Sequence, residues 1–358
     1  MKHCRRCVYP ETKPNLWFDD TGLCSACIAF EDRKHINWEG RRLRFEREFT
    51  PKTRVVAAVS GGKDSHYIVV KLKEMGLDVL AVCASTDDLT PIGRKNLDNI
   101  GNLCELIEAT PNRTQRRQMA KYALETVGDI SWCEHVLIWT IPALIARRFN
   151  IEHVFYGENP QNEYGAGPRE SQKLAGMPPQ WEQEFGGMLG LRVSDMMEQF
   201  PKGNFNPYRM PRVMPRRHFL GYYLPWDGEQ NAISMMYDYG FTWWHGTVET
   251  SCVPWENLDN HQTGIHDYFR YIKYGYTRAH DILGSAIRRG KMDRLLAIEF
   301  INKMDPFPVT YIGKKIEDVL ADIGMTMDEF WQTVGQFTNR NLFSLVDGDI
   351  PQPKFEIE

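Results

Sequence analysis

Four cysteines near the start of the chain form two pairs with metal-ligand spacing. Cys4 and Cys7 make one C-x2-C pair, and Cys24 and Cys27 make a second after sixteen intervening residues. Thiolates spaced in this way can reach one metal ion from tight turns, and two turns complete a tetrahedral site. A closed four-thiolate site has no open position for a substrate, so we expect a structural zinc ion. Two disulfides are the alternative, but the chain lacks secretory features and a reducing cytosol disfavours them.

A second chemical signal lies at residues 60–65, which read S-G-G-K-D-S directly after the apolar run 54–59. Two glycines let the backbone come close to an anion, and the amides of a turn that opens a helix point outward. The string differs from the Walker form G-x-x-x-x-G-K-[ST] and from the dinucleotide form G-x-G-x-x-G. We therefore predict a phosphate-binding loop of a different kind.

Alternating strands and helices must position this loop. Apolar runs predict strands at 54–59, 78–84, 105–109 and 153–156, and helical periodicity predicts helices at 66–75, 92–104, 114–127 and 134–149. This alternation predicts an α/β fold with a doubly wound, Rossmann-like parallel sheet. Ligands of such sheets bind beyond the carboxyl ends of the strands, which is where residues 60–65 fall.

Three regions follow from the patterning. We expect a zinc-binding module and connecting helix at 1–50 and an α/β domain at 51–226, with a long excursion over the active face from residue 157. A mainly helical region at 227–358 would contain helices at 262–273, 278–289 and 292–302 and end in a loose tail at 351–353.

Composition narrows the possible functions. The 43 basic and 47 acidic residues give a formal charge of −4, which argues against a broad nucleic-acid-binding surface. The longest uncharged apolar run, at 136–146, is too short to cross a bilayer, and no signal peptide opens the chain. We expect a cytoplasmic protein.

The loop at 60–65 resembles the pyrophosphate-binding loop of the PP-loop ATP pyrophosphatases. That resemblance implies an enzyme that cleaves ATP between the α and β phosphates, with Mg²⁺, and transfers AMP to a substrate oxygen. It also implies the nucleotide-binding residues, which are Ser60, Gly61, Gly62, Lys63, Asp64, Ser65, Ala84, Ser85 and Gly157.

Two branches of this superfamily compete, because an adenylated oxygen can be displaced by ammonia or by sulfur. A tRNA-thiolating enzyme could also carry N-terminal cysteine pairs, but sulfur transfer generally needs clustered thiols near the nucleotide. The remaining cysteines (Cys83, Cys104, Cys133 and Cys252) are isolated in the sequence. A non-enzymatic zinc- and nucleotide-binding scaffold is a third alternative.

Further strings sharpen the resemblance. GENPQNEYG at 157–165, WENLD at 255–259, HDYFRYIKYGYTRAHD at 266–281 and IRRG at 287–290 are similar in order and spacing to the bacterial N-acetyl sugar amidotransferases of the WbpG/PseA type. This family is linked to lipopolysaccharide O-antigen and other surface-polysaccharide synthesis. The resemblance implies conversion of an acetamido group on a nucleotide-linked sugar into an acetamidino group. It also implies ammonia from a separate glutaminase with a cyclase-like barrel subunit.

Four residues are the candidate catalytic groups: Asp64, Glu158, Lys273 and Arg278. Glu158 follows the strand 153–156 and could bind Mg²⁺ or orient ammonia, a turn cap being its alternative role. Lys273 and Arg278 flank Gly275 and could neutralise charge on departing pyrophosphate, unless they are solvated surface charges. The roles of His266 and Asp267 stay open.

Overall fold

The predicted strands form the centre of the fold. A computed structural model describes residues 1–165, 175–176, 187–200, 206–346 and 350–357. Its central sheet has five parallel strands in the order β3-β2-β1-β4-β5. The strands are β1 (Arg54–Val59), β2 (Asp78–Ala84), β3 (Glu105–Ala109), β4 (His153–Tyr156) and β5 (Arg216–Phe219).

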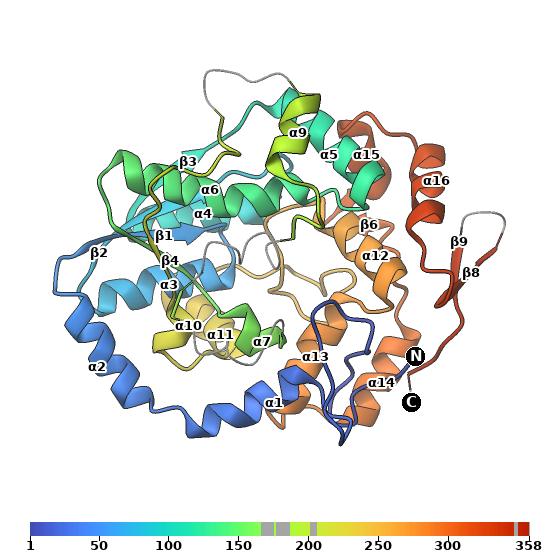
Figure 1. Ribbon diagram of the computed structural model, residues 1–358, viewed down its shortest axis with the longest axis horizontal. Coiled ribbons are helices and arrows are strands. Elements are labelled where there is room, and N and C mark those ends of the chain that lie inside the picture. Colours follow the sequence, from blue (N-terminus) through green and yellow to red (C-terminus); the bar gives the residue numbers. More distant parts are fainter. Residues whose placement is uncertain (166–174, 177–186, 201–205, 347–349, 358) are drawn as a thin grey trace.

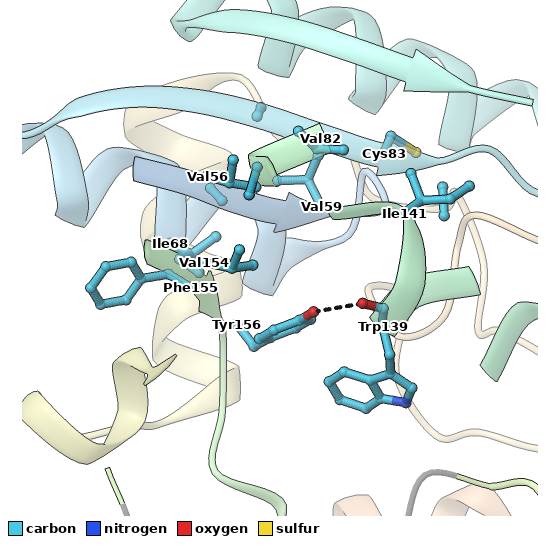
Figure 2. Close-up of a cluster of buried hydrophobic side chains, with 14 of the residues drawn as sticks. Val56, Val59, Ile68, Val82, Cys83, Trp139, Ile141, Val154, Phe155 and Tyr156 are labelled. Atoms are coloured by element: carbon cyan, nitrogen blue, oxygen red, sulfur yellow. Dashed lines mark hydrogen bonds between the residues drawn. The ribbon is translucent and has the colours of Figure 1, made fainter. Parts of the chain in front are cut away.

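Helices cover both faces of this sheet, so the predicted doubly wound α/β fold is confirmed (Figure 1). The connecting helices are α3 (Lys63–Glu74), α4 (Pro91–Leu103), α5 (Arg113–Val127) and α6 (Trp132–Arg148). Figure 2 shows Val56, Val82 and Val154 from three strands packed in one cluster. All three are fully buried, and burial of such a side chain stabilises a fold by about 1.5–3 kcal/mol.

The strand order reverses between β1 and β4. From β1 the chain proceeds outward through β2 to β3, and it then returns to place β4 on the other side of β1. In open α/β sheets the crevice at such a reversal, beyond the carboxyl ends of the strands, is the usual ligand site. The loop 60–65 follows β1 and Glu158 follows β4, so the topology brings both to this crevice.

The strand β5 was missed in the sequence, where residues 157–225 are predicted to be irregular. Its sequence is R-R-H-F, which lacks the apolar run typical of a buried parallel strand. Instead, buried polar groups pack at this edge, where His153 Nδ1 lies 3.1 Å from His218 Nε2. Burial and the neighbouring His153 lower the pKa of His218 to about 3. Within the predicted excursion, residues 166–174, 177–186 and 201–205 lie outside the described residues, and the described part includes short elements such as α9 (Val193–Gln199).

Mainly helical structure follows the sheet, as predicted, and it shares a second apolar core with residues of α3 and α5. Its helices are α10 (Leu220–Tyr223), α11 (Gly228–Tyr239), α12 (Thr263–Tyr274), α13 (Arg278–Arg288), α14 (Arg294–Lys303), α15 (Ile316–Asp322) and α16 (Met327–Phe337). Two short hairpins accompany them: β6 (Thr310–Tyr311) with β7 (Lys314–Lys315), and β8 (Phe343–Val346) with β9 (Ile350–Pro353).

The predicted loose tail at 351–353 is therefore wrong. Pro351 is buried and lies opposite Leu345 in the β8–β9 pair. Proline is tolerated at the edge of a sheet because no ladder hydrogen bond from its nitrogen is needed there. Every helix among the described residues is too short or too polar to cross a bilayer.

The N-terminal segment packs beside α13 and α14, which lie far from it in the sequence (Figure 1). It contains α1 (Ser25–Asp32), the short 3-10 helix η1 (Arg33–His35) and α2 (Trp38–Glu48). It also holds α7 (Pro160–Tyr164), because Ser25 Oγ donates a hydrogen bond to the Gly165 carbonyl at 2.7 Å. Arg33 of η1 forms an ion pair with Glu163 of α7. This docking fixes the segment that follows Glu158.

Gly165 tests the docking of α7. Its φ is +70°, and a Cβ there would lie 2.3 Å from the backbone nitrogen of Ala26. We expect Gly165→Ala to lower the free energy of unfolding by about 1–3 kcal/mol more than Gly190→Ala does, because it adds overpacking to the strain of a positive φ. Gly190 is the matched control, since its φ is +83° and no atom lies within 4 Å of the added carbon. Chemical denaturation measures both; equal losses would contradict the tight contact.

Candidate active site

The glycine-rich loop turns the chain from β1 into α3. Gly61 has a φ of +101°, and a Cβ on it would lie 3.1 Å from the Gly93 carbonyl oxygen. The Ser60 amide donates to Ser65 Oγ at 2.8 Å, which closes the turn. Gly62 is the N-cap of α3 and has no side chain to cap its amides. Such a helix N-terminus offers free N–H groups and a positive dipole to an anion.

A cavity of about 440 Å³ lies along the carboxyl ends of the strands, and we call it the sheet-edge cavity. The loop contributes five of its lining residues, which are Ser60, Gly62, Lys63, Asp64 and Ser65. Ala84 and Thr86 from the end of β2 and Gly157 from the end of β4 also line it. Most of the residues that were predicted to bind the nucleotide thus line one cavity.

A second cavity of about 410 Å³ lies among α13, α14 and the segment around Trp226, and we call it the helix-side cavity. Apolar groups dominate one part of it, including Leu283, Leu296 and Phe300. Arg289 and Lys291 line it with Asp227, which forms ion pairs with both cations at 3.3 and 3.2 Å.

The two cavities meet at a shared set of residues that we call the junction. It consists of Lys63, Asp64, Glu158, Tyr164, Trp255, Glu256 and Arg278, which line both cavities. Lys63 Nζ lies 2.7 Å from Asp64 and 2.9 Å from Glu256. A group held there would be within reach of ligands in both cavities.

Burial and neighbouring charges shift the pKa values of several side chains at the junction from their values in water. Burial raises the pKa of Asp64, although Lys63 acts against that shift. Burial, followed by the charge of Asp64, raises the pKa of Glu158 to about 7. Burial acts to lower the pKa of Lys63, but Asp64 and Glu256 outweigh it and hold that pKa well above its usual value. At neutral pH the Glu158 carboxyl group can therefore both accept and release a proton.

Three predicted residues lie elsewhere. Gly61 shapes the loop without lining either cavity, and Ser85 is buried with its carbonyl accepting a hydrogen bond from Arg116. Lys273 Nζ donates to the carbonyls of Val127 and Gly128 at 3.3 and 2.9 Å, at the end of α5. The ammonium group therefore stabilises a helix C-terminus and lines neither cavity.

Arg278 does reach the junction. Its guanidinium group donates to both carboxylate oxygens of Asp267, at 2.8 and 3.2 Å, and this bidentate pair fixes its position. Asp267, which the sequence left without a role, thus orients a cation of the site.

Sequence reasoning missed several residues of the site. Glu256 and Trp255 lie within the WENLD string, and Tyr164 lies within the GENPQNEYG string, but none was singled out. The acidic residues of the WENLD string were the signal that could have identified this part of the site. Asp259 of the same string lines the sheet-edge cavity, and burial raises its pKa.

A further group, Asp129, His135 and His266, was also missed as a set. His135 and His266 line the sheet-edge cavity, and both contact Asp129 through Nδ1. Burial acts to raise the pKa of Asp129, but the two histidines hold it well below its usual value. The charge of Asp129 in turn raises the pKa of His135 against the effect of burial.

The four N-terminal cysteines converge and are all buried. Sγ of Cys4 lies 3.8 Å from that of Cys27, and Sγ of Cys7 lies 3.6 Å from that of Cys24, so no pair is a disulfide. The Cys24 amide donates to Cys4 Sγ at 3.3 Å, which suits a thiolate ligand. The donor set could hold a structural metal ion such as zinc, as the spacing predicted.

Comparison with known families places the C-terminal region. Residues 237–350 match the family described as LPS biosynthesis protein WbpG-like, C-terminal domain. The matched segment begins within α11 and ends at the start of β9, so it includes Trp255, Glu256 and Arg278 of the junction. A search of curated proteins found no match.

Removal of one thiolate tests the metal site. We expect elemental analysis to find about one zinc ion per chain that depends on the four cysteines, and Cys24→Ser to lose that ion with a marked loss of stability, because the ion supplies folding free energy. Cys83→Ser is the control, since Cys83 is equally buried in the main core but outside the cluster. An iron–sulfur absorption spectrum, or a zinc content in Cys24→Ser equal to that of the parent, would contradict this assignment.

Proposed function

We propose that the chain is an ATP-dependent amidotransferase, starting from the match of residues 237–350 to the C-terminal domain of WbpG-like LPS biosynthesis proteins. It would replace the acetamido oxygen of a nucleotide-linked N-acetylated sugar with ammonia, forming an acetamidino sugar, AMP and pyrophosphate. The observation that carries the proposal is the junction, where a glycine-rich phosphate-type loop and a buried carboxyl group connect two cavities.

ATP would occupy the sheet-edge cavity. The amides at the start of α3, with Ser60 and Ser65, suit the β and γ phosphates, and the end of β2 at Ala84 suits the nucleoside. Asp64 and Glu256 offer carboxylate oxygens, which are the protein ligands that Mg²⁺ prefers. When bound, the ion would neutralise phosphate charge.

The acceptor sugar would occupy the helix-side cavity, with its acetamido group at the junction. The acetamido oxygen forms a bond to the α phosphorus of ATP, and the bond from that phosphorus to the β-phosphate oxygen breaks, so pyrophosphate leaves with the electron pair. The cations Lys63 and Arg278 line the junction, where they would stabilise the charge that develops on the departing group.

Ammonia then completes the exchange. Its nitrogen forms a bond to the imidate carbon, the carbon–oxygen bond to AMP breaks, and the nitrogen loses a proton. Glu158, with a pKa of about 7, is suited to accept that proton.

A separate protein would supply the ammonia. Glutaminases commonly use a thiolate nucleophile, and Cys252 is the cysteine that lines the helix-side cavity. Burial, followed by the charge of Glu256, raises the pKa of Cys252 to about 12, which keeps it protonated and unreactive. The partner that the family resemblance implies is a glutaminase with a cyclase-like barrel subunit, and ammonium salts would substitute for it.

The half-reaction is the direct test. Incubation with ATP, Mg²⁺, a UDP-linked acetamido sugar and ammonium should yield AMP and pyrophosphate, with a sugar product lighter by about one mass unit because NH replaces O. Asp64→Asn should lose at least about 10²-fold in rate while it stays folded. Asp98→Asn, at an exposed aspartate on α4, should keep full activity. Formation of ADP and phosphate instead would refute the proposal.

The rate should depend on pH through Glu158. If its carboxylate accepts the proton, the rate at saturating ammonium should fall about tenfold per pH unit below about 7, and Glu158→Gln should abolish that dependence with a loss of about 10²–10⁴-fold. Because folding raises this pKa, ionisation of Glu158 lowers the stability of the fold as pH rises through about 7. Glu158→Gln should thus be at least as stable as the parent protein at pH 8, which separates catalytic loss from unfolding. Glu152→Gln is the control, because Glu152 is exposed and lies directly before β4.

A further inference from the structure

Three side chains from separate elements converge at one end of the sheet-edge cavity. Asp129 lies in the turn between α5 and α6, His135 in the first turns of α6 and His266 in α12. His266 Nδ1 lies 2.8 Å from Asp129 Oδ1, and His135 Nδ1 lies 3.3 Å from Asp129 Oδ2. One nitrogen or oxygen atom from each residue lies within 4.8 Å of those from the other two.

We propose that Asp129, His135 and His266 bind a divalent transition-metal ion of the Zn²⁺ or Mn²⁺ class, in addition to the ion at the four cysteines. Imidazole nitrogens with a carboxylate oxygen are a ligand set for such ions, whereas Ca²⁺ and Mg²⁺ prefer oxygen alone. Zinc bonds of about 2.0–2.1 Å require ligand atoms roughly 3.3 Å apart in a tetrahedron. The 3.3 Å between His135 Nδ1 and Asp129 Oδ2 equals that separation, whereas the 2.8 Å between His266 Nδ1 and Asp129 Oδ1 is shorter.

The surroundings of Asp129 hold the carboxylate in place. The Ser131 amide donates to Asp129 Oδ1 at 2.9 Å, and Lys273 Nζ donates to the carbonyl of the adjacent Gly128. Fixed ligands of this kind reduce the entropy lost when an ion binds, and such supporting contacts are typical of metal sites. The ammonium group of Lys273, which lines neither cavity, acquires a function as the anchor of the turn that carries Asp129.

The site would be open on one side. His135 and His266 line the sheet-edge cavity while Asp129 lies behind them. Three protein ligands leave positions free for water or for an oxygen of a molecule in the cavity, which distinguishes this site from the closed four-cysteine site. The carbonyl oxygen of Gly187, 3.3 Å from His135 Nδ1, is a further oxygen at the same place.

Elemental analysis of the full chain tests the proposal, and it does not depend on the proposed reaction. After equilibration with Zn²⁺ and removal of free ion by gel filtration, the parent protein should carry about two zinc ions per chain. His266→Ala and Asp129→Asn should each carry one. Cys83→Ser should keep both ions, and His245→Ala, which changes an exposed histidine, should also keep both.

The ion retained at the four cysteines shows that each variant has folded, so loss of the second ion cannot be attributed to unfolding. Titration with Co²⁺ adds a second readout. The parent should show the weak visible bands of nitrogen- and oxygen-bound cobalt, and the His266→Ala variant with zinc at its cysteines should lack them. One zinc ion in the parent, together with identical cobalt spectra, would overturn the proposal and leave two ordinary Asp–His hydrogen bonds. A failed amidotransferase assay with two ions bound would refute only the reaction.

Discussion

The buried ammonium group of Lys63 is the contact on which the arrangement of the site depends. It joins Asp64 of the loop after β1 to Glu256, which lies almost two hundred residues later in the chain. Buried charges are tolerated only when they are paired, and removal of one partner typically costs about 3–5 kcal/mol. The pair therefore holds the C-terminal region against the sheet edge. It also keeps the carboxyl groups of Asp64 and Glu256 close together, although like charges at this spacing repel.

The four-cysteine segment influences the same site without touching it. The apolar cluster of this segment is small. The structure of the segment therefore depends on polar contacts with the helical region and on any metal ion that the four cysteines bind. Tyr9 donates to Asp281 on α13 at 2.8 Å, and Arg294 at the start of α14 donates to the Cys7 carbonyl at 3.2 Å. Through Ser25 and Arg33 the segment then holds α7, whose last residue, Tyr164, lines the junction. A metal ion bound at the cysteines would thereby fix the position of one residue of the junction.

The local features of the fold could be predicted from sequence, whereas contacts between distant segments could not. Four strands with apolar runs, the cysteine pairs and the loop at 60–65 each carry their signal within a few residues. In contrast, β5 has a polar sequence, and the β8–β9 hairpin contains two prolines, so neither has a readable period. Lys273 was expected near the phosphates because of its charge. It lies two helical turns beyond His266, on a face of α12 that packs against the end of α5.

The site is divided between two cavities, and the segment that matches the C-terminal family forms part of both. Residues 237–350 do not form a separate accessory unit, because they supply Glu256 and Arg278 to the junction. The loop and β4 supply Lys63 and Glu158 from the other side. Lys63 and Glu158 thus lie at the edge of the sheet, while α13 and α14 form a wall of the helix-side cavity. Substitutions on α13 and α14 can therefore alter the shape of that cavity without changing any residue of the loop or of β4.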